Sequence, residues 1–196
     1  MAMAEAELRG DIEGLEGPEK STFSVSFVGN TFANGEILDV EIPQNLPQLK
    51  FTPKAGMKYT CICSDPDAIS RAQPTYREFI HWCCSDLQFA EDGTMTSEGK
   101  TVLAYCGPGP PYGTSLHRYA FLLYEQPEGS DPGSLAGAFE GRGGKRAVLA
   151  AKAAGLGDCV GISWFQAEWG PVVDDVHAGI GFMPPPEFQS PKQKGG

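Results

Sequence analysis

Residues 107–124 read GPGPPYGTSLHRYAFLLY. A Gly/Pro loop leads into the polar trio His117-Arg118-Tyr119, and a long apolar run rich in β-formers follows. This pattern is typical of a buried strand, which we place at residues 116–125. Alternation along a strand puts His117 and Tyr119 on one face and Arg118 on the other. The segment therefore predicts a buried strand that begins with polar side chains behind a stiff loop.

Other segments show the same kind of pattern on both sides of this strand. We expect further strands at 23–28, 36–42, 57–64, 79–87, 101–106 and 159–168. The Ala-rich stretch 145–154 predicts a helix, and 171–176 a short one. Many strands with late helices indicate a mainly β protein. We expect a two-sheet antiparallel β-sandwich with peripheral helices near the C-terminus.

The length of 196 residues, 41% of them apolar, is enough for one compact domain with a sizeable core. We divide the chain into an acidic N-terminal segment at 1–20, a folded domain at 21–182 and a disordered Pro/Lys tail at 183–196. The first segment lacks the apolar stretch of a secretory signal, and no run approaches the roughly 18 apolar residues of a membrane helix. We therefore expect a cytoplasmic protein without membrane insertion.

Charge and cysteine content narrow the classes of partner and site. The formal net charge is −10, which disfavours nucleic acid and anionic membrane surfaces as partners. The six cysteines do not have the spacing of a disulfide scaffold and include no C-x-x-C pair. We expect free thiols in a reducing compartment, no structural zinc, no cofactor and a monomer.

Polar residues gather at the predicted strand ends. Asp65-Pro66-Asp67 follows one strand, and His81 lies in the next. Two neighbouring aspartates are common in turns, but a cation between them would also relieve their repulsion. A lone core histidine is more often structural, yet a second imidazole at His117 favours an anion site, because protonated histidine binds phosphate.

Catalytic interpretations of the same residues remain open as alternatives. Ser115 with His and Asp suggests a triad, although the G-x-S-x-G motif is missing. Cys83 near His81 suggests a thiol nucleophile, and the two histidines with an aspartate suggest zinc. Nothing in the spacing supports these three, so we expect a binding protein rather than an enzyme.

Three ordered motifs resemble the phosphatidylethanolamine-binding protein family, which includes the Raf kinase inhibitor protein. They are Asp65-Pro66-Asp67-Ala68 with Ser70-Arg71, Tyr76-Arg77-Glu78-Phe79-Ile80-His81-Trp82, and Gly109-Pro110-Pro111-Tyr112-Gly113-Thr114-Ser115-Leu116-His117-Arg118-Tyr119. The resemblance extends from about Phe23 to His177. Ile69 and Ser115 depart from the family's usual proline and glycine.

The resemblance implies a two-sheet antiparallel sandwich with a pocket for a phosphate-bearing head group. The ligand-binding residues that it implies are Asp65, Asp67, His81, Gly109, Pro110, Pro111, His117 and Tyr119. Further candidates for the pocket lining are Tyr76, Phe79, Gly107 and His177.

We therefore expect a ligand of the phosphoethanolamine or phosphate type, or a phosphorylated side chain. The resemblance implies protein kinases or serine proteases as partners that the chain would inhibit. A small hydrolase that acts on a phosphorylated or ester substrate is the rival, and a scaffold with an idle pocket is a third interpretation. If protonated imidazoles hold the anion, affinity falls as the pH rises from about 6 to 8.

Overall fold

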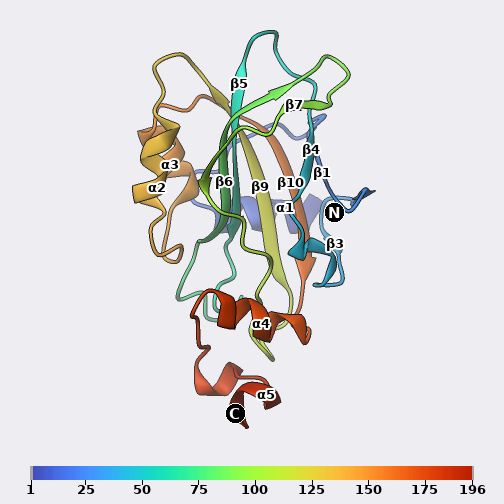
Figure 1. Cartoon of the computed structure of the whole chain (residues 1–196), viewed down its shortest axis with the longest axis vertical. Coiled ribbons are helices and arrows are strands. Elements are labelled where there is room, and N and C mark those ends of the chain that lie inside the picture. The colour runs from blue at the N-terminus through green and yellow to red at the C-terminus, as the bar shows by residue number, and fades with distance from the viewer. Residues whose placement is uncertain (1, 196) are drawn as a thin grey trace.

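The structure, a computed structural model, describes residues 2–195 and is mainly β (Figure 1). The strands are β1 Ser24–Phe27, β2 Asn30–Thr31, β3 Glu36–Ile37, β4 Gln48–Lys50, β5 Lys58–Asp65, β6 Phe79–Phe89, β7 Met95–Ser97, β8 Lys100–Leu103, β9 His117–Gln126 and β10 Cys159–Ala167. The helices are α1 Ala2–Asp11, α2 Leu135–Ala138, α3 Ala147–Ala153, α4 Val172–Gly179 and α5 Pro191–Lys194. Short 3-10 turns occupy Ile42–Gln44, Pro132–Ser134 and Pro186–Phe188.

The strands form one large curled sheet and one small sheet. The large sheet has the order β3-β10-β9-β5-β6-β7, with β8 also paired to β6, and the small one has the antiparallel order β2-β1-β4. The prediction of a wholly antiparallel arrangement is wrong, because β3 runs parallel to β10. The large sheet is therefore mixed. The long crossover from β3 to β10 makes the parallel pairing possible, since a tight hairpin can join only antiparallel strands.

Two apolar clusters cover the opposite faces of the large sheet. The first lies under the small sheet and is rich in aromatic side chains, among them Phe27, Phe121 and Phe165. The second includes Ile62, Leu122 and the buried residues of α1, α2 and α3. The central strands are consequently buried on both faces, which explains why their sequences read as nearly continuous apolar runs.

Both ends of the chain contain a helix that the sequence did not predict. The acidic N-terminal segment contains α1. Leu8 of this helix and Ile12, the first residue after it, are completely buried. The tail that we expected to be disordered contains α5, and Ser190 just before it is buried. Its hydroxyl donates to Asp174 of α4 at 2.7 Å, so a specific contact orders the segment.

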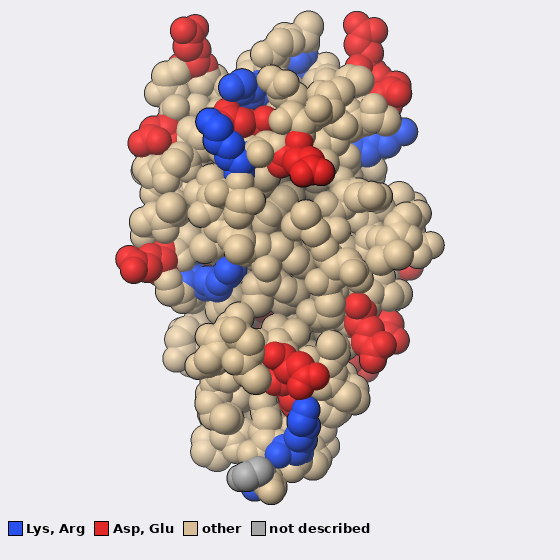
Figure 2. Space-filling view, viewed as in Figure 1, with Lys and Arg blue, Asp and Glu red and all other residues tan. Residues whose placement is uncertain are grey.

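The charged side chains on the face drawn in Figure 2 are mixed in sign, and acidic groups stand at several points of the outline. Within residues 2–195, no helix combines the length and the apolar character needed to cross a membrane.

Candidate functional site

Three neighbouring strands bring ionisable side chains to one end of the large sheet, the end where α4 lies (Figure 1). Strand β5 ends at Asp65, whereas β6 begins at Phe79 and β9 begins at His117. Asp65 pairs with Phe79 across β5 and β6, and Ser64 pairs with Ala120 across β5 and β9. Because these pairs are antiparallel, the end of one strand meets the beginnings of its two neighbours.

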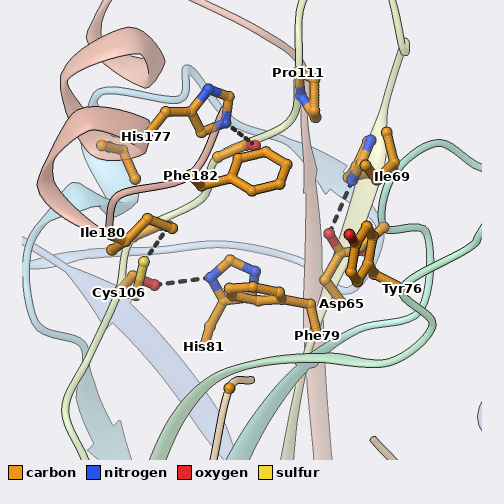
Figure 3. Close-up of a pocket in the computed structure, with 16 residues that line it drawn as sticks. Asp65, Ile69, Tyr76, Phe79, His81, Cys106, Pro111, His177, Ile180 and Phe182 are labelled. Carbon is orange, nitrogen blue, oxygen red and sulfur yellow. Dashed lines mark hydrogen bonds and ion pairs between the residues drawn. The ribbon is translucent and has the colours of Figure 1, made fainter. Parts of the chain in front are cut away.

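A cavity of about 140 Å³ opens at this end of the sheet (Figure 3). A cavity of this size admits a benzene-sized group. Figure 3 shows Asp65, Ile69 and Tyr76 on one side and His177, Ile180 and Phe182 on the other. The residues that line it are Asp65, Ala68, Ile69, Tyr76, Phe79, His81, Cys106, Gly107, Gly109, Pro111, His117, Gly141, Val176, His177, Ile180 and Phe182.

Asp65 and His117 form a buried pair. Nδ1 of His117 donates to Oδ2 of Asp65 at 2.8 Å, and the exposed fractions are 3% for Asp65 and 1% for His117. Nε2 of the same ring lies 3.0 Å from Oγ1 of Thr114, whose hydroxyl also contacts the carbonyl of Pro111 at 2.7 Å. The hydrogen bond to Asp65 fixes the orientation of the imidazole. A carboxylate and a proton donor therefore lie together at the cavity wall.

His81 is the second imidazole of the cavity. Its Nδ1 donates to the carbonyl of Cys106 at 2.9 Å, and Figure 3 shows the other ring nitrogen turned toward Asp65. The ring packs against Phe79 and Tyr119, with centroid distances of 4.8 and 5.1 Å. Burial lowers the pKa of His81 below its usual value, although the nearby carboxylate of Asp65 opposes this shift. Burial therefore favours the neutral form of the ring.

Tyr119 lies behind His81 and is 1% exposed. Its hydroxyl has no hydrogen-bond partner within the part of the chain that the structure describes. Burial raises the pKa of this phenol well above its usual value, so the hydroxyl keeps its proton. A buried, unpaired donor beside the cavity is costly for folding alone.

His177 comes from α4 and closes the other side of the cavity. Its Nε2 donates to the carbonyl of Gly109 at 2.9 Å, and Nδ1 accepts from the side-chain amide of Gln193 at 3.2 Å. Both ring nitrogens are thus engaged within the protein. Burial lowers the pKa of His177, and one donated and one accepted bond suit a neutral ring.

Asp67 points away from the cavity and pairs with Arg118. The guanidinium donates to both carboxylate oxygens, at 2.6 and 2.8 Å, and the backbone amide of Arg118 adds a third bond at 2.9 Å. Both side chains are completely buried. Arg118 therefore supplies the positive charge beside Asp67, while Asp65 pairs with His117.

Most of the predicted site residues come together in this cavity. Those that line it are Asp65, His81, Gly109, Pro111 and His117, and with them the further candidates Tyr76, Phe79, Gly107 and His177. Asp67, Pro110 and Tyr119 are outside the lining. Asp67 shapes the segment behind the cavity, and Tyr119 lies one layer deeper, against His81.

The donor set does not resemble a metal centre. Within residues 2–195, no group of three or more His, Cys, Asp and Glu side chains is arranged to hold a metal ion. All six cysteines are free and buried.

Residues 28–159, more than half of the chain, match the sequence model of the family described as phosphatidylethanolamine-binding protein. The chain belongs to the phosphatidylethanolamine-binding protein family. The match includes every strand that contributes Asp65, His81 or His117 to the cavity.

Individual proteins resemble the chain in sequence or in fold. An uncharacterized protein of Saccharomyces cerevisiae is 35% identical over 119 residues, which are 55% of this chain and 59% of the yeast protein. A carboxypeptidase Y inhibitor, solved with its cognate proteinase, shares the fold with a TM-score of 0.66 and 23% identity, over 86% of this chain and 94% of that one. The phosphatidylethanolamine-binding protein of Plasmodium vivax has a TM-score of 0.63 and 21% identity, over 86% of this chain and 96% of that one.

Sequence reasoning missed much of the apolar lining of the cavity. Ile180 and Phe182 follow α4 and face the histidines, and Ile69 faces them from the opposite side. Ile69 was noted only as a departure from the family pattern. Ile180 and Phe182 lie beyond both the resemblance, which ends at about His177, and the matched residues 28–159, so no sequence signal placed these side chains at the cavity.

Proposed function

We propose that this member of the family binds a phosphate-bearing head group or a phosphorylated side chain in the cavity, and thereby modulates a protein partner. The convergence of Asp65, His81 and His117 from three strands in one cavity of about 140 Å³ carries the proposal. Small-ligand sites are mostly apolar cavities with a few convergent polar groups, which describes this one.

Each polar residue has a distinct role in the proposed complex. His81 takes a proton and donates from Nε2 to the anion, and Tyr119 donates its unpaired hydroxyl. His117, oriented by Asp65, supplies a further donor once the anion competes with Thr114. The apolar side chains of Ile69, Ile180 and Phe182 pack against the organic part of the ligand.

A ³¹P NMR titration tests this binding directly. Phosphoethanolamine and inorganic phosphate are each added to the wild type, to His81→Ala and to His177→Gln. Charge-assisted hydrogen bonds contribute about 1.5–3 kcal/mol each, so His81→Ala should weaken binding ten- to hundredfold. Equal affinity in the wild type and His81→Ala, or no binding by the wild type, would contradict the proposal.

A protease is the first class of partner to test, because a carboxypeptidase Y inhibitor has the same fold. The family resemblance also suggests kinases. Inhibition assays with the wild type and His81→Ala would separate a ligand-dependent modulator from a scaffold, since a scaffold acts equally well with the altered cavity.

One observation favours a hydrolase as the second candidate. Thr114, His117 and Asp65 lie in the order of a nucleophile, a base and an orienting acid, and the series would act once the Thr114 hydroxyl turns its proton from the Pro111 carbonyl to His117. This function predicts turnover of an ester or phosphoester that disappears in Thr114→Val. Thr114 does not line the cavity, which favours binding over hydrolysis.

A further inference from the structure

Helix α1 lies outside the residues that match the family, yet it is docked firmly on the domain. Leu8, Ile12 and Leu15 are between 0% and 7% exposed and belong to the second apolar cluster. Leu8 lies in α1, and Ile12 and Leu15 lie in the turn that follows the helix. The apolar contacts therefore fix where the last residue of α1, Asp11, lies.

Asp11 bridges two arginines of the domain. Its Oδ2 accepts from Nη2 of Arg118 at 2.6 Å, and its Oδ1 lies 2.9 Å from Nη1 of Arg77. Both arginines hold the segment 65–67 on their other side. Nε of Arg77 donates to the carbonyl of Pro66 at 2.7 Å, and Arg118 donates to both oxygens of Asp67.

The same segment continues to the cavity. The backbone amide of Asp67 donates to Oδ1 of Asp65 at 2.7 Å, and Oδ2 of Asp65 accepts from His117. An unbroken series of hydrogen bonds thus leads from α1 through Arg118 and the two aspartates to the imidazole. Arg118, Asp67 and His117 are at most 1% exposed, so water screens these contacts little.

The electrostatics of Asp11 agree with this arrangement. Partial burial alone would raise its pKa, but the hydrogen bonds and charges of Arg118 and Arg77 hold it below the usual value. Asp11 is therefore a carboxylate in the folded protein and neutralises part of the charge of the two guanidinium groups.

We propose that Asp11 is a positioning residue of the anion site and that the docking of α1 is coupled to anion binding. The inference rests on the proposed function and assigns the site a support that the family domain alone does not supply. Asp11 orients Arg118 and Arg77, these fix the segment 65–67, and Asp65 then holds His117 in the orientation that the ligand meets. Coupling is reciprocal, so bound anion also stabilises the docked helix.

The decisive variant is Asp11→Asn, with Glu5→Gln as its matched control. Each removes one negative charge from α1, and Glu5 is about as exposed as Asp11 but, among residues 2–195, forms its ion pair with Arg9 of the same helix. Inorganic phosphate and phosphoethanolamine affinities should fall roughly fivefold or more in Asp11→Asn. Glu5→Gln should bind like the wild type.

Two readouts separate positioning from a general loss of structure. In ligand-free protein, the ¹⁵N resonances of the His117 ring should shift in Asp11→Asn and stay unchanged in Glu5→Gln. In the wild type, saturating phosphate should slow amide exchange in residues 4–12. If Asp11→Asn unfolds, Arg77→Gln is the substitute variant, because it removes the ion pair of Asp11 with Arg77 and leaves the one with Arg118. It should lower phosphate affinity and shift the His117 resonances, both by less than Asp11→Asn would.

The outcomes are distinct. Unchanged His117 resonances in Asp11→Asn, or equal phosphate affinity in Asp11→Asn and Glu5→Gln, overturn the inference. Absence of any phosphate binding by the wild type overturns the proposed function and with it the coupling, whereas the ligand-free spectra still report on the positioning of His117.

Discussion

The ring of His81 meets the ring of Tyr119 edge to face, with 5.1 Å between their centroids. Burial disfavours the charged form of both groups, so it lowers the pKa of His81 and raises that of Tyr119. Both rings therefore favour their neutral forms in the ligand-free cavity. If an anion binds here, either His81 takes up a proton when the anion binds, or the anion binds to the minor population of the protein in which the ring is already protonated.

The first prediction concerns the pH dependence of anion affinity. An anion stabilises protonated His81, so affinity rises as the pH falls through the pKa that the ring has in the complex. Burial lowers the pKa of the free ring, which sets the lower limit of this change, so we expect the rise in affinity to continue to pH values below the window of about 6 to 8 expected from the sequence. At pH values above the pKa of the ring in the complex, the affinity does not depend on pH.

Calorimetry with sulfate measures this profile, since sulfate keeps its charge between about pH 5 and 7. The slope should be absent in His81→Ala, which controls for other titrating groups. An affinity that does not change between pH 5 and 7, or that changes equally in both proteins, would show that His81 does not take up the proton.

A second prediction distinguishes the two histidines on opposite sides of the cavity. Both ring nitrogens of His177 are occupied by Gly109 and Gln193, and glutamine can also donate to the Gly109 carbonyl. His177→Gln should therefore change phosphate affinity by no more than about threefold, in contrast to His81→Ala. It should cost about 1 kcal/mol of stability, because the edge-on contact with Phe182 is lost.

Titrations and urea unfolding of the two variants, done in parallel, check this contrast. A loss of affinity in His177→Gln as large as that in His81→Ala would mean that His177 turns into the cavity and contacts the anion.

The sequence predicted the central strands better than the ends of the chain. The expected strands 79–87 and 116–125 are confirmed as β6 and β9 within two residues at each end, because long apolar runs with β-formers leave few alternatives. Helix α1 was missed. The apolar signal of this segment was weak, because Leu8 lies within the helix whereas the other two buried apolar residues, Ile12 and Leu15, follow it.

One wall of the cavity could be predicted from the sequence, whereas the opposite wall could not. Asp65, His81 and His117 were recognisable because polar residues at the ends of apolar strands are unusual. The opposite wall, with Ile180 and Phe182, depends on how α4 docks, and a short helix with apolar residues does not reveal which side chains will face a distant loop.

A third prediction uses Glu78, a carboxyl that is 1% exposed. Burial raises its pKa, although hydrogen bonds from the Ser64 hydroxyl and the Ala147 amide oppose the shift. For an acid with a raised folded pKa, the neutral form favours folding, so this contribution is present at low pH and is lost as the pH rises through the folded pKa.

Glu78→Gln keeps the shape and stays neutral, and the Ser64 hydroxyl can accept from the new amide. Its free energy of unfolding, relative to the wild type, should therefore increase from pH 4.5 to pH 7. Urea unfolding at both pH values measures this difference, with exposed Glu91→Gln as the control. A difference that stays constant with pH would mean that Glu78 titrates normally in the folded protein.

The last prediction concerns the unpaired hydroxyl of Tyr119. In the ligand-free protein it is buried and without a partner among residues 2–195, so Tyr119→Phe should leave stability unchanged or raise it by up to about 1 kcal/mol. If the hydroxyl donates to the bound anion, the same variant should lose phosphate affinity by about tenfold or more. Tyr124→Phe is a matched control, because the Tyr124 hydroxyl is also buried without a partner among residues 2–195, but Tyr124 belongs to the apolar cluster on the other face of the sheet, whereas Tyr119 packs against His81. It should show the same stability behaviour with unchanged affinity. A destabilised Tyr119→Phe with wild-type affinity would mean that the hydroxyl serves the fold and not the ligand, and the neutral donor beside His81 would then have no part in binding.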